Sequence, residues 1–346
     1  MNAIIENDLN EIISKSYIDY TKLKDSTVLV TGATGMLASY VILSLLHLNK
    51  TKCLNITIIG LARSEDKAMA RFGEFISSGE LRMIYGDVCH EFECTEKLDY
   101  VLHLAGGASP RAITQNPTGV IAANTIGLTN VLERARRDSA KVLFASTREV
   151  YGEMPKEKVE IKEGDMGVLN TMTPRNCYPL SKRLGENLLV AYNKECGVPF
   201  IIVRIAHSYG PMMAVKDDGR VMSDFIGCAL RGEDIMLYSS GEALRAFCYV
   251  SDAVSGIFTA LLMGGDNDVY NLANESEEIS VLGLAKTIVR ASKSDISVRH
   301  ITPTEQVLSS YTNFARVRLS TQKLESLGWR AIVSLEQGLQ RTLSGV

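Results

Sequence analysis

The sequence predicts an α/β fold, a doubly wound parallel sheet with a smaller C-terminal lobe. The first observation is a regular alternation of short apolar segments with longer helical segments. The second is a glycine-containing turn directly after the first apolar segment. The expected strands are 27–31, 56–61, 82–86, 99–104, 141–146 and 199–204, and the expected helices are 36–47, 65–77, 120–137 and 179–195. Continuous apolar strands that alternate with helices are typical of a parallel sheet covered on both faces.

The turn after the first expected strand has the features of a dinucleotide-binding loop. Gly32 permits the tight turn, Gly35 lets the backbone approach a pyrophosphate, and Ala38 allows close packing of the helix on the strand. The N-terminus of the following helix then presents free N–H groups to the phosphates. The sequence therefore predicts a Rossmann-type domain whose loop contacts come from Gly32, Thr34, Gly35, Met36 and Leu37.

The end of the second expected strand bears on the choice between NAD and NADP. An acidic residue there would bind the ribose 2′-hydroxyl, whereas a basic residue tolerates a 2′-phosphate. Here the strand is followed by Arg63 and Ser64, with no acid before Glu65. These residues favour NADP(H). The alternative is that Ser64 caps the next helix and Arg63 is solvated, which leaves NAD(H) possible.

A pair of polar segments predicts the catalytic residues. Ser146 and Thr147 follow the fifth strand, at the edge where such sheets bind ligands. Tyr178 and Lys182 are four residues apart and share one face of a helix. A neighbouring ammonium lowers the pKa of a tyrosine and makes it an effective acid or base. Thr147 is expected to hydrogen-bond the same substrate oxygen as Tyr178.

Three regions are expected along the chain. Residues 1–24 form an N-terminal helical extension, with apolar residues along one side of a helix over 5–15. Residues 25–205 form the dinucleotide-binding domain and carry the catalytic residues. After about residue 205 the alternation weakens, so residues 206–346 are expected to form mainly the substrate lobe, with segments that return to the sheet.

Composition excludes several classes of function. The 346 residues carry a net charge of −3, which gives no electrostatic footprint for nucleic acid or membrane. No apolar run approaches the ~18 residues of a membrane span, and the acidic N-terminus lacks a signal-peptide pattern. A cytoplasmic protein is therefore expected. The seven cysteines form no CxxC pair, and no two of the five histidines share a helical face, so no metal site is expected.

Motifs spread over the chain carry a family resemblance. From about residue 25 to 344 the sequence resembles extended short-chain dehydrogenases/reductases that act on nucleotide sugars. Within them it looks most like the branch of UDP-glucuronate decarboxylases and nucleotide-4-keto-6-deoxyhexose reductases. The matching residues are His103-Leu104-Ala105, Ala108-Ser109-Pro110, Asn116-Pro117, Ser146-Thr147, Glu149-Val150-Tyr151-Gly152, Pro174-Arg175, Cys177-Tyr178, Lys182-Arg183, Arg204, Tyr209-Gly210-Pro211, Arg245 to Asp252, Arg316 and Gly328-Trp329.

The resemblance implies roles for individual residues. Thr147, Tyr178 and Lys182 would be the catalytic triad, with Glu149 beside them. The dinucleotide contacts would extend to Asp87, Val88, Leu104 and Ala105 in addition to Tyr178 and Lys182, and Asn124 would support the site. The substrate would be bound by Ser109, Arg148, His207, Arg220, Arg245 and Arg316.

Two positions depart from the family pattern. Sugar 4,6-dehydratases carry an Asp-Glu pair after the threonine, and this chain has Arg148-Glu149, which disfavours dehydration. His207 stands where the family usually has Asn, so the contacts to the substrate phosphates cannot be carried over directly. His207 could bind substrate or be a satisfied loop histidine.

Three functions are compatible with these residues. The first is an NAD(P)H-dependent reductase of the C4 ketone of a nucleotide 4-keto-6-deoxyhexose, such as dTDP-4-keto-6-deoxyglucose, giving dTDP-fucose for O-antigen or surface polysaccharide. The second is a redox-neutral UDP-glucuronate decarboxylase or nucleotide-sugar 4-epimerase with bound NAD⁺, assisted by Glu149 and an arginine such as Arg316. The third is a non-catalytic dinucleotide sensor, which would not need the triad. Because net reductases use NADPH, Arg63 favours the first.

A homodimer is also expected. In enzymes that this chain resembles, two long helices pair across the interface, and here these are 119–137 and 178–193. Leu132 and Leu189 are expected to face outward on these helices and to form part of a four-helix interface.

Overall fold

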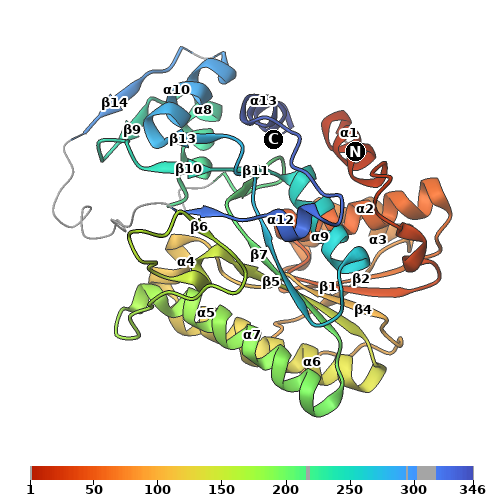
Figure 1. Ribbon diagram of the computed structural model, residues 1–346. Coiled ribbons are helices and arrows are strands. Elements are labelled where there is room, and N and C mark those ends of the chain that lie inside the picture. The colour runs from red at the N-terminus through yellow and green to blue at the C-terminus, as the bar shows by residue number, and fades with distance from the viewer. Residues whose placement is uncertain (1, 216–218, 294, 302–316, 346) are drawn as a thin grey trace.

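The computed structural model describes residues 2–215, 219–293, 295–301 and 317–345 (Figure 1). Among these residues a central sheet contains seven strands, all parallel, in the spatial order β12-β7-β5-β4-β1-β2-β3. The strands are β1 Thr27–Thr31, β2 Thr57–Ala62, β3 Arg82–Tyr85, β4 Tyr100–His103, β5 Lys141–Thr147, β7 Phe200–Ile205 and β12 Asp268–Leu272. The order runs outward from β1 in two directions, so the doubly wound α/β fold is confirmed.

Helices cover both faces of this sheet (Figure 1). The larger apolar core joins the sheet to helices that include α2 Met36–Lys52, α3 Glu65–Ser77 and α9 Val250–Met263, and a second core joins it to α6 Ile126–Asp138 and α7 Cys177–Cys196. α5 Pro117–Asn124 packs against α7. β1, β2, β5 and β7 are buried along most of their length because both faces are covered, whereas the edge strand β3 is not.

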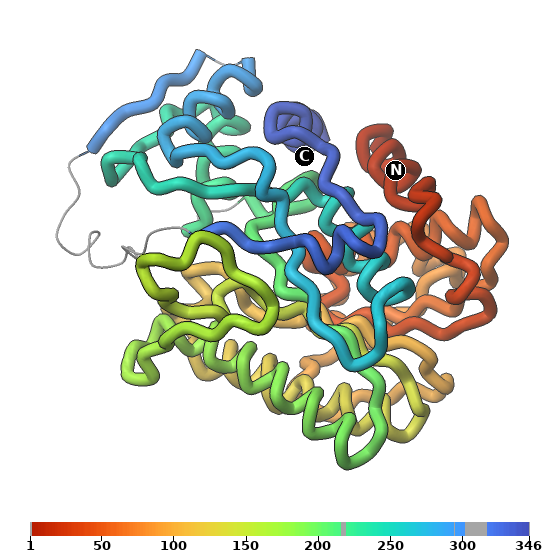
Figure 2. Tube along the Cα trace, in the orientation of Figure 1, coloured from red at the N-terminus to blue at the C-terminus, as the bar shows by residue number. Residues whose placement is uncertain are grey.

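The N-terminal segment is part of the larger core. In α1 (Ala3–Ile13), Leu9 and Ile12 are fully buried, and the helix packs against α2 and α9. The following 3-10 turn, η1 (Tyr20–Leu23), is buried through Tyr20 and Leu23. The chain begins beside the place where it ends, because α1 lies next to α13 (Leu335–Gly345) (Figure 2).

Elements after β7 gather in a smaller lobe in the upper part of Figure 1. β12 and α9 belong to the same half of the sequence but join the central sheet and its cover. Besides α13, the other elements after β7 are β8 Ser208–Tyr209, α8 Val221–Arg231, β9 Ile235–Leu237, β10 Leu244–Ala246, β11 Cys248–Tyr249, β13 Glu278–Ser280, α10 Val281–Ser292, β14 Val298–His300, β15 Arg318–Leu319 and α12 Gln322–Glu325. Short elements that precede β7 are α4 Pro110–Gln115, η2 Arg148–Tyr151, β6 Glu160–Ile161 and η3 Pro174–Asn176.

The structure corrects the expected outward residues of the dimer helices. Leu132 and Leu189 are both fully buried in the core between the sheet and α6 and α7, so the prediction that they face outward is wrong. The expected single helix over 120–137 is also divided at Thr125, whose φ of −119° and ψ of −71° depart from helical values.

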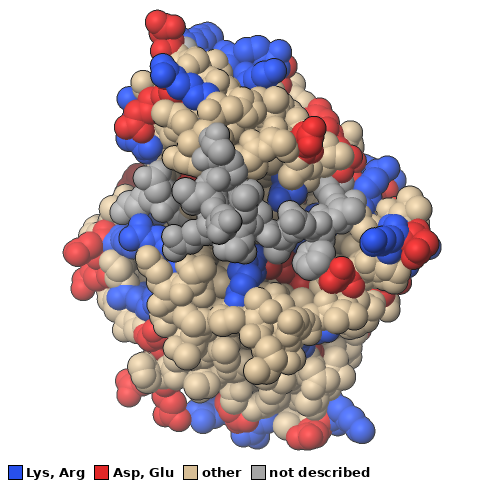
Figure 3. Space-filling model, turned by 90° about the vertical axis from the view of Figure 1, so that its left-hand side faces the viewer, with Lys and Arg blue, Asp and Glu red and all other residues tan. Residues whose placement is uncertain are grey.

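The surface carries charges of both signs. On the face shown in Figure 3, lysine and arginine side chains are interspersed with aspartate and glutamate. No helix in the described part of the chain has the length and apolar character needed to cross a membrane.

Candidate active site

The turn from β1 to α2 is shaped for a close backbone approach. Gly32 has φ +68°, and a Cβ atom on it would lie 2.8 Å from Ala105 Cα, so only glycine fits without displacement. Gly35 is the N-cap of α2, where no side chain caps the helix. The first N–H groups of α2 therefore remain for a ligand such as a pyrophosphate. The predicted loop contacts Gly32, Thr34, Gly35, Met36 and Leu37 all lie in this turn and the start of α2.

Arg63 and Ser64 have different surroundings at the end of β2. The Arg63 side chain is 80% exposed, and its guanidinium lies 3.9 Å from the Asp87 carboxylate. Ser64 is the N-cap of α3, and its hydroxyl accepts a hydrogen bond from the Lys67 N–H at 3.3 Å. The alternative considered for Ser64, a helix cap, is therefore present in the structure, while Arg63 extends into solvent.

Asp87 and Val88 follow β3. The Asp87 carboxylate accepts the Cys89 N–H at 2.9 Å, and this bond, with the charge of Arg63, holds the pKa of Asp87 below its ordinary value. Val88 is buried, and its side chain lies against Gly127 of α6. The two residues thus combine an ionised carboxylate with an apolar wall, a combination that suits the base and ribose of a nucleotide.

Hydrogen bonds join the end of β4 to the end of β1. The Ala105 N–H donates to the Thr31 hydroxyl at 3.3 Å, and that hydroxyl lies 3.0 Å from His103 Nδ1. Complete burial lowers the pKa of His103 to about 3, so its ring is neutral. These bonds hold Leu104 and Ala105, two predicted dinucleotide contacts, beside Gly32.

Thr147 and Tyr178 meet although they are far apart in the sequence. Thr147 ends β5 and Tyr178 lies at the start of α7; both are less than 8% exposed, and the Thr147 hydroxyl is near enough to the Tyr178 phenol to lower its pKa. The Thr147 hydroxyl also accepts the Glu149 N–H at 3.2 Å. The two hydroxyl groups expected to contact one substrate oxygen therefore lie together.

The pKa of Tyr178 is shifted in the direction opposite to the expected one. Burial raises the pKa of the Tyr178 phenol, and the negative charge of Glu149 raises it further. The neighbouring Thr147 hydroxyl and the charge of Arg175 lower the pKa of Tyr178 by less. Burial dominates because the ring is almost wholly removed from water.

Lys182 is buried one helical turn after Tyr178. Its ammonium donates to the Ala145 carbonyl at 2.6 Å and lies 4.4 Å from the centre of the Phe144 ring. Burial lowers the pKa of Lys182 to about 7. Near it, the Asn124 amide donates to Ser181 Oγ at 3.0 Å, while Asn124 Oδ1 is buried without a hydrogen-bond partner among the described residues. An unpartnered buried acceptor of this kind is suited to a bound ligand or water.

A bidentate ion pair lies beside the triad. Arg175 donates to both carboxylate oxygens of Glu149, at 2.9 and 3.1 Å, and both side chains are about one-third exposed. The sequence placed Glu149 in the site but gave Arg175 no role. The signal was present, because Arg175 stands only three residues before Tyr178 in the quoted Pro174-Arg175 motif.

The residues predicted to bind substrate lie on several separate elements. Ser109 caps α4 by accepting the Ala112 N–H at 3.2 Å, and Arg148 donates to the Val317 carbonyl at 3.1 Å. The exposed His207 ring lies 5.7 Å from the Phe247 ring. Two further arginines belong to the smaller lobe, and the last lies outside the described residues: Arg220 at the N-cap of α8, Arg245 in β10, and Arg316.

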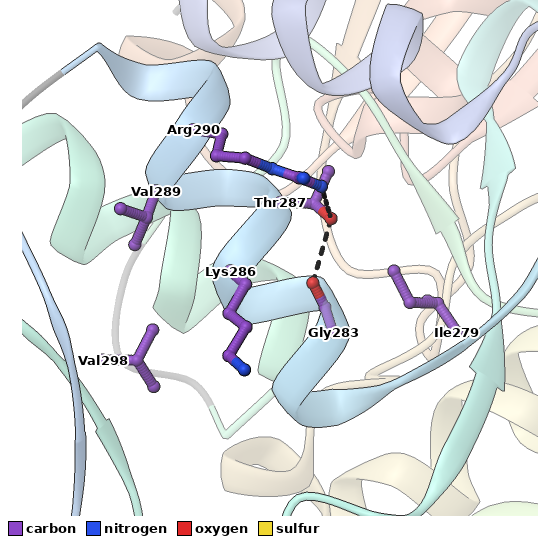
Figure 4. A pocket seen from close by; sticks show the side chains of 7 residues that line it. All are labelled: Ile279, Gly283, Lys286, Thr287, Val289, Arg290 and Val298. Carbon is purple, nitrogen blue, oxygen red and sulfur yellow. Dashed lines mark hydrogen bonds between the residues drawn. The ribbon is translucent and has the colours of Figure 1, made fainter.

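A hollow of about 660 Å³ opens beside α10, and Figure 4 shows the seven side chains that line it. One of them, Ile279, is the register partner of Arg245 in the β10–β13 pair. Lys286 and Arg290 contribute positive charge, while Val289 and Val298 make the wall apolar. The predicted site residues are not among those that line this hollow.

Comparison with known proteins identifies the family. Residues 28–273 match the family model described as the NAD dependent epimerase/dehydratase family. The chain belongs to this family. The match spans the dinucleotide turn, the triad and the last strand of the central sheet, and the expected family resemblance is therefore confirmed.

Individual known proteins are similar to this chain over most of its length. UDP-glucuronic acid decarboxylase 6 of Arabidopsis thaliana is 33% identical over 312 residues, which are 90% of this chain and 86% of that protein. UDP-glucuronic acid decarboxylase 1 of Xenopus tropicalis is 37% identical over 248 residues, 71% of this chain and 56% of that protein. The solved UDP-N-acetylglucosamine 4-epimerase of Methanobrevibacter ruminantium has the same fold, with a TM-score of 0.77 at 22% identity, covering 93% of this chain and 98% of that one.

Proposed function

We propose that this family member is a redox-neutral UDP-glucuronate decarboxylase that works with bound NAD⁺. The observation that carries the proposal is the Arg175–Glu149 ion pair beside Thr147 and Tyr178. The similarity to UDP-glucuronic acid decarboxylases supports it, because relatives with that name are 32 to 38% identical to this chain. This replaces the reductase favoured by the sequence as the leading candidate.

The proposed reaction has three stages on the sugar. Oxidation of the C4 hydroxyl gives a ketone, which makes the C6 carboxylate part of a β-keto acid. The C5–C6 bond then breaks, carbon dioxide leaves, and the electron pair enters an enolate with the C4 oxygen. Protonation at C5 and reduction at C4 give the UDP-pentose. The dinucleotide supplies the hydride acceptor and donor for the first and last stages, so no reduced cofactor is consumed.

The triad moves the proton on the C4 oxygen. Tyr178 is placed to take the hydroxyl proton during oxidation and to return it during reduction. The Thr147 hydroxyl lies near the Tyr178 phenol and can orient the same oxygen. The ammonium of Lys182, one turn away on α7, favours the phenolate when it is charged.

The Arg175–Glu149 pair explains why a sugar with a carboxylate fits this site. An unpaired Glu149 would repel the C6 carboxylate of a glucuronate, and Arg175 offsets that charge with two hydrogen bonds. Arg175 can also transfer one of these bonds to the substrate carboxylate. A 6-deoxy sugar carries a methyl group at that position and gains nothing from the pair.

A direct incubation tests the proposal. The enzyme is mixed with UDP-glucuronate and NAD⁺, and separately with dTDP-4-keto-6-deoxyglucose and NADPH, while products are identified by mass and nicotinamide absorbance is followed. We expect carbon dioxide and a UDP-pentose from the glucuronate, without lasting change in absorbance. Arg175→Met, which leaves the Glu149 carboxylate uncompensated beside the C6 carboxylate, should abolish most of that turnover. Stoichiometric loss of NADPH with the keto sugar and no carbon dioxide would instead establish the reductase.

The reductase remains the second candidate because of Arg63. Its exposed guanidinium at the end of β2 is available for a 2′-phosphate, as NADP(H) requires. If it binds that phosphate, Arg63→Ala should weaken NADPH binding by ~1.5–3 kcal/mol and leave NADH binding unchanged. Titration of both proteins with both cofactors measures this. Equal NADPH affinity in wild type and variant would remove the reason for preferring NADP.

A further inference from the structure

A buried ion pair lies beneath the catalytic helix. Arg204 of β7 donates to Glu186 of α7 through Nε at 2.9 Å and Nη2 at 2.6 Å. Both side chains are almost completely removed from water, at 6% and 10% exposure. Two buried charges cost desolvation free energy that apolar residues would not. The pair therefore calls for a role other than filling the space between α7 and the sheet.

The remaining bonds of the pair lead to the triad. Glu186 Oε1 also accepts the Ser146 hydroxyl at 2.5 Å, and Ser146 directly precedes Thr147 at the end of β5. Arg204 donates its Nη1 to the Glu163 carbonyl at 2.7 Å and lies over the Tyr151 ring. Arg204 thus fixes the carboxylate of Glu186, and that carboxylate in turn holds Ser146 at the end of β5.

Lys182 and Glu186 act on adjacent residues of the same strand. They are one turn apart on α7, and Lys182 donates to the carbonyl of Ala145 while Glu186 accepts from the side chain of Ser146. The negative charge of Glu186 raises the pKa of Lys182, against the burial that lowers it to about 7. Glu186 is therefore the nearby charge that opposes neutralisation of Lys182.

The other titratable groups around Lys182 do not supply a negative charge that favours its charged form. On β4, His103 is neutral, with a pKa of about 3. On α7, Tyr178 is uncharged because burial raises its pKa. On β7, Arg204 is bound to Glu186, and Glu149 is bound to Arg175 beside Tyr178. The β5 and α5 residues nearest Lys182 are Phe144, Ala145 and Asn124, which do not titrate.

We propose that Glu186 is a positioning residue of the active site, which keeps Lys182 charged and fixes the strand end that carries Thr147. The inference rests on the proposed roles of Thr147, Tyr178 and Lys182, but it does not depend on which sugar is converted. Glu186 acts through its neighbours and needs no contact with substrate.

Two variants separate the two effects. Glu186→Gln removes the charge and can still accept the Ser146 hydrogen bond, whereas Ser146→Ala removes that hydrogen bond and keeps the charge. The full-length protein is labelled with ¹⁵N-lysine, and the Nζ signal of Lys182 is assigned by its loss in Lys182→Met. We expect the titration midpoint of that signal to fall by about one pH unit in Glu186→Gln. In Ser146→Ala the midpoint should stay in place while kcat falls about tenfold.

The pH profile of turnover gives the second measurement. The alkaline fall in kcat should move to lower pH in Glu186→Gln and keep its position in Ser146→Ala. If Glu186→Gln does not fold, Glu186→Gln with Arg204→Met is compared with Arg204→Met alone, so that the two proteins differ only in the charge of Glu186. An unmoved Lys182 midpoint in the folded variant overturns the inference. Because the titration needs no substrate, it is decided separately from any failure to release carbon dioxide.

Discussion

At the scale of single residues, the catalytic proton depends on how Tyr178 is surrounded. Its ring is buried, and the neighbouring groups that influence the pKa of its hydroxyl are Thr147, Glu149 and Arg175. Burial and Glu149 raise the pKa of Tyr178, so ionisation of the phenol requires compensating positive charge or hydrogen bonding in the working complex. Arg175 supplies part of this charge and at the same time holds Glu149.

Tyr178→Phe removes the phenol and keeps the ring. We expect kcat to fall by at least ~10²-fold, since the Thr147 hydroxyl, which is expected at the same oxygen, is a much weaker acid than a phenol. Dinucleotide affinity should change little, because the ring packing is retained. Tyr192→Phe serves as the control: it lies on the same helix, and its hydroxyl bonds Glu133 instead of facing the triad. Near-normal turnover of Tyr178→Phe would assign the proton to another group.

Sequence reasoning found the residues whose spacing along the chain determines their neighbours. Tyr178 and Lys182 share one face of their helix wherever that helix packs. Gly32 has a left-handed φ because of the tight turn in which it lies, which is a local feature. Arg175 and Glu149 are 26 positions apart, so their ion pair exists only because the fold brings η3 to η2. The Glu186–Arg204 pair joins a helix to a strand and could not be recognised for the same reason.

At the scale of elements, Asp252 at the start of α9 binds residues 329–333, the segment before α13, through hydrogen bonds. The Asp252 carboxylate accepts the N–H groups of Ile332 and Val333 at 3.0 and 2.9 Å, and its backbone carbonyl accepts Trp329 Nε1 at 3.0 Å. Asp252 is 1% exposed. Burial raises the pKa of Asp252 from 3.8 to about 6, more than these hydrogen bonds lower it.

This shift predicts how stability changes with pH. Because the folded state binds the Asp252 proton more tightly than the unfolded state, stability from this group decreases as pH rises from about 4 to about 6. The difference of roughly two pH units corresponds to about 3 kcal/mol. Asp252→Asn should therefore raise the unfolding free energy more at pH 7 than at pH 4.5, measured with urea. Asp295→Asn, an exposed change, should show no such difference. A pH-independent effect of Asp252→Asn would contradict the prediction.

Element boundaries could be predicted where the local signal is complete. β1 and α3 have the predicted bounds, since an apolar run defines the strand and Ser64 with two acids begins the helix. The short strands β6, β8, β11 and β15 contain two residues each and pair with distant segments. Such pairs carry no periodicity, so they were not predicted. β12 belongs to the second half of the sequence, and its register with β7 depends on the fold.

At the scale of the whole molecule, α5, α6 and α7 present an apolar outer surface. Ile121, Ile126, Leu184 and Val190 are 42%, 54%, 50% and 50% exposed. These residues, and not Leu132 or Leu189, are the candidates for the homodimer interface. The helices that carry them lie side by side along one face of the sheet (Figure 1).

We expect the wild type to sediment at twice the 37.9 kDa of one chain at micromolar concentration. Introducing Leu184→Glu together with Val190→Glu places charges in the expected apolar interface and should give a monomer that keeps its helical content. Val159→Glu, at an 81% exposed position outside these helices, should leave the dimer intact. A wild type that sediments only as a monomer would exclude the interface.

The contact between the two ends of the chain has a consequence during synthesis on the ribosome. Asp8 is wholly buried, hydrogen-bonded to Tyr40 and Tyr249, and bound by Arg341 at 3.0 Å across 333 positions. At about 5–20 residues per second, roughly 15–70 s separate translation of Asp8 from translation of Arg341. During that time the Asp8 carboxylate lacks the Arg341 guanidinium of α13, so we expect α1 to dock in its final form only after Arg341 has left the ribosome. A nascent chain stalled before Arg341 should therefore leave α1 open to protease while β1 to β7 are already protected.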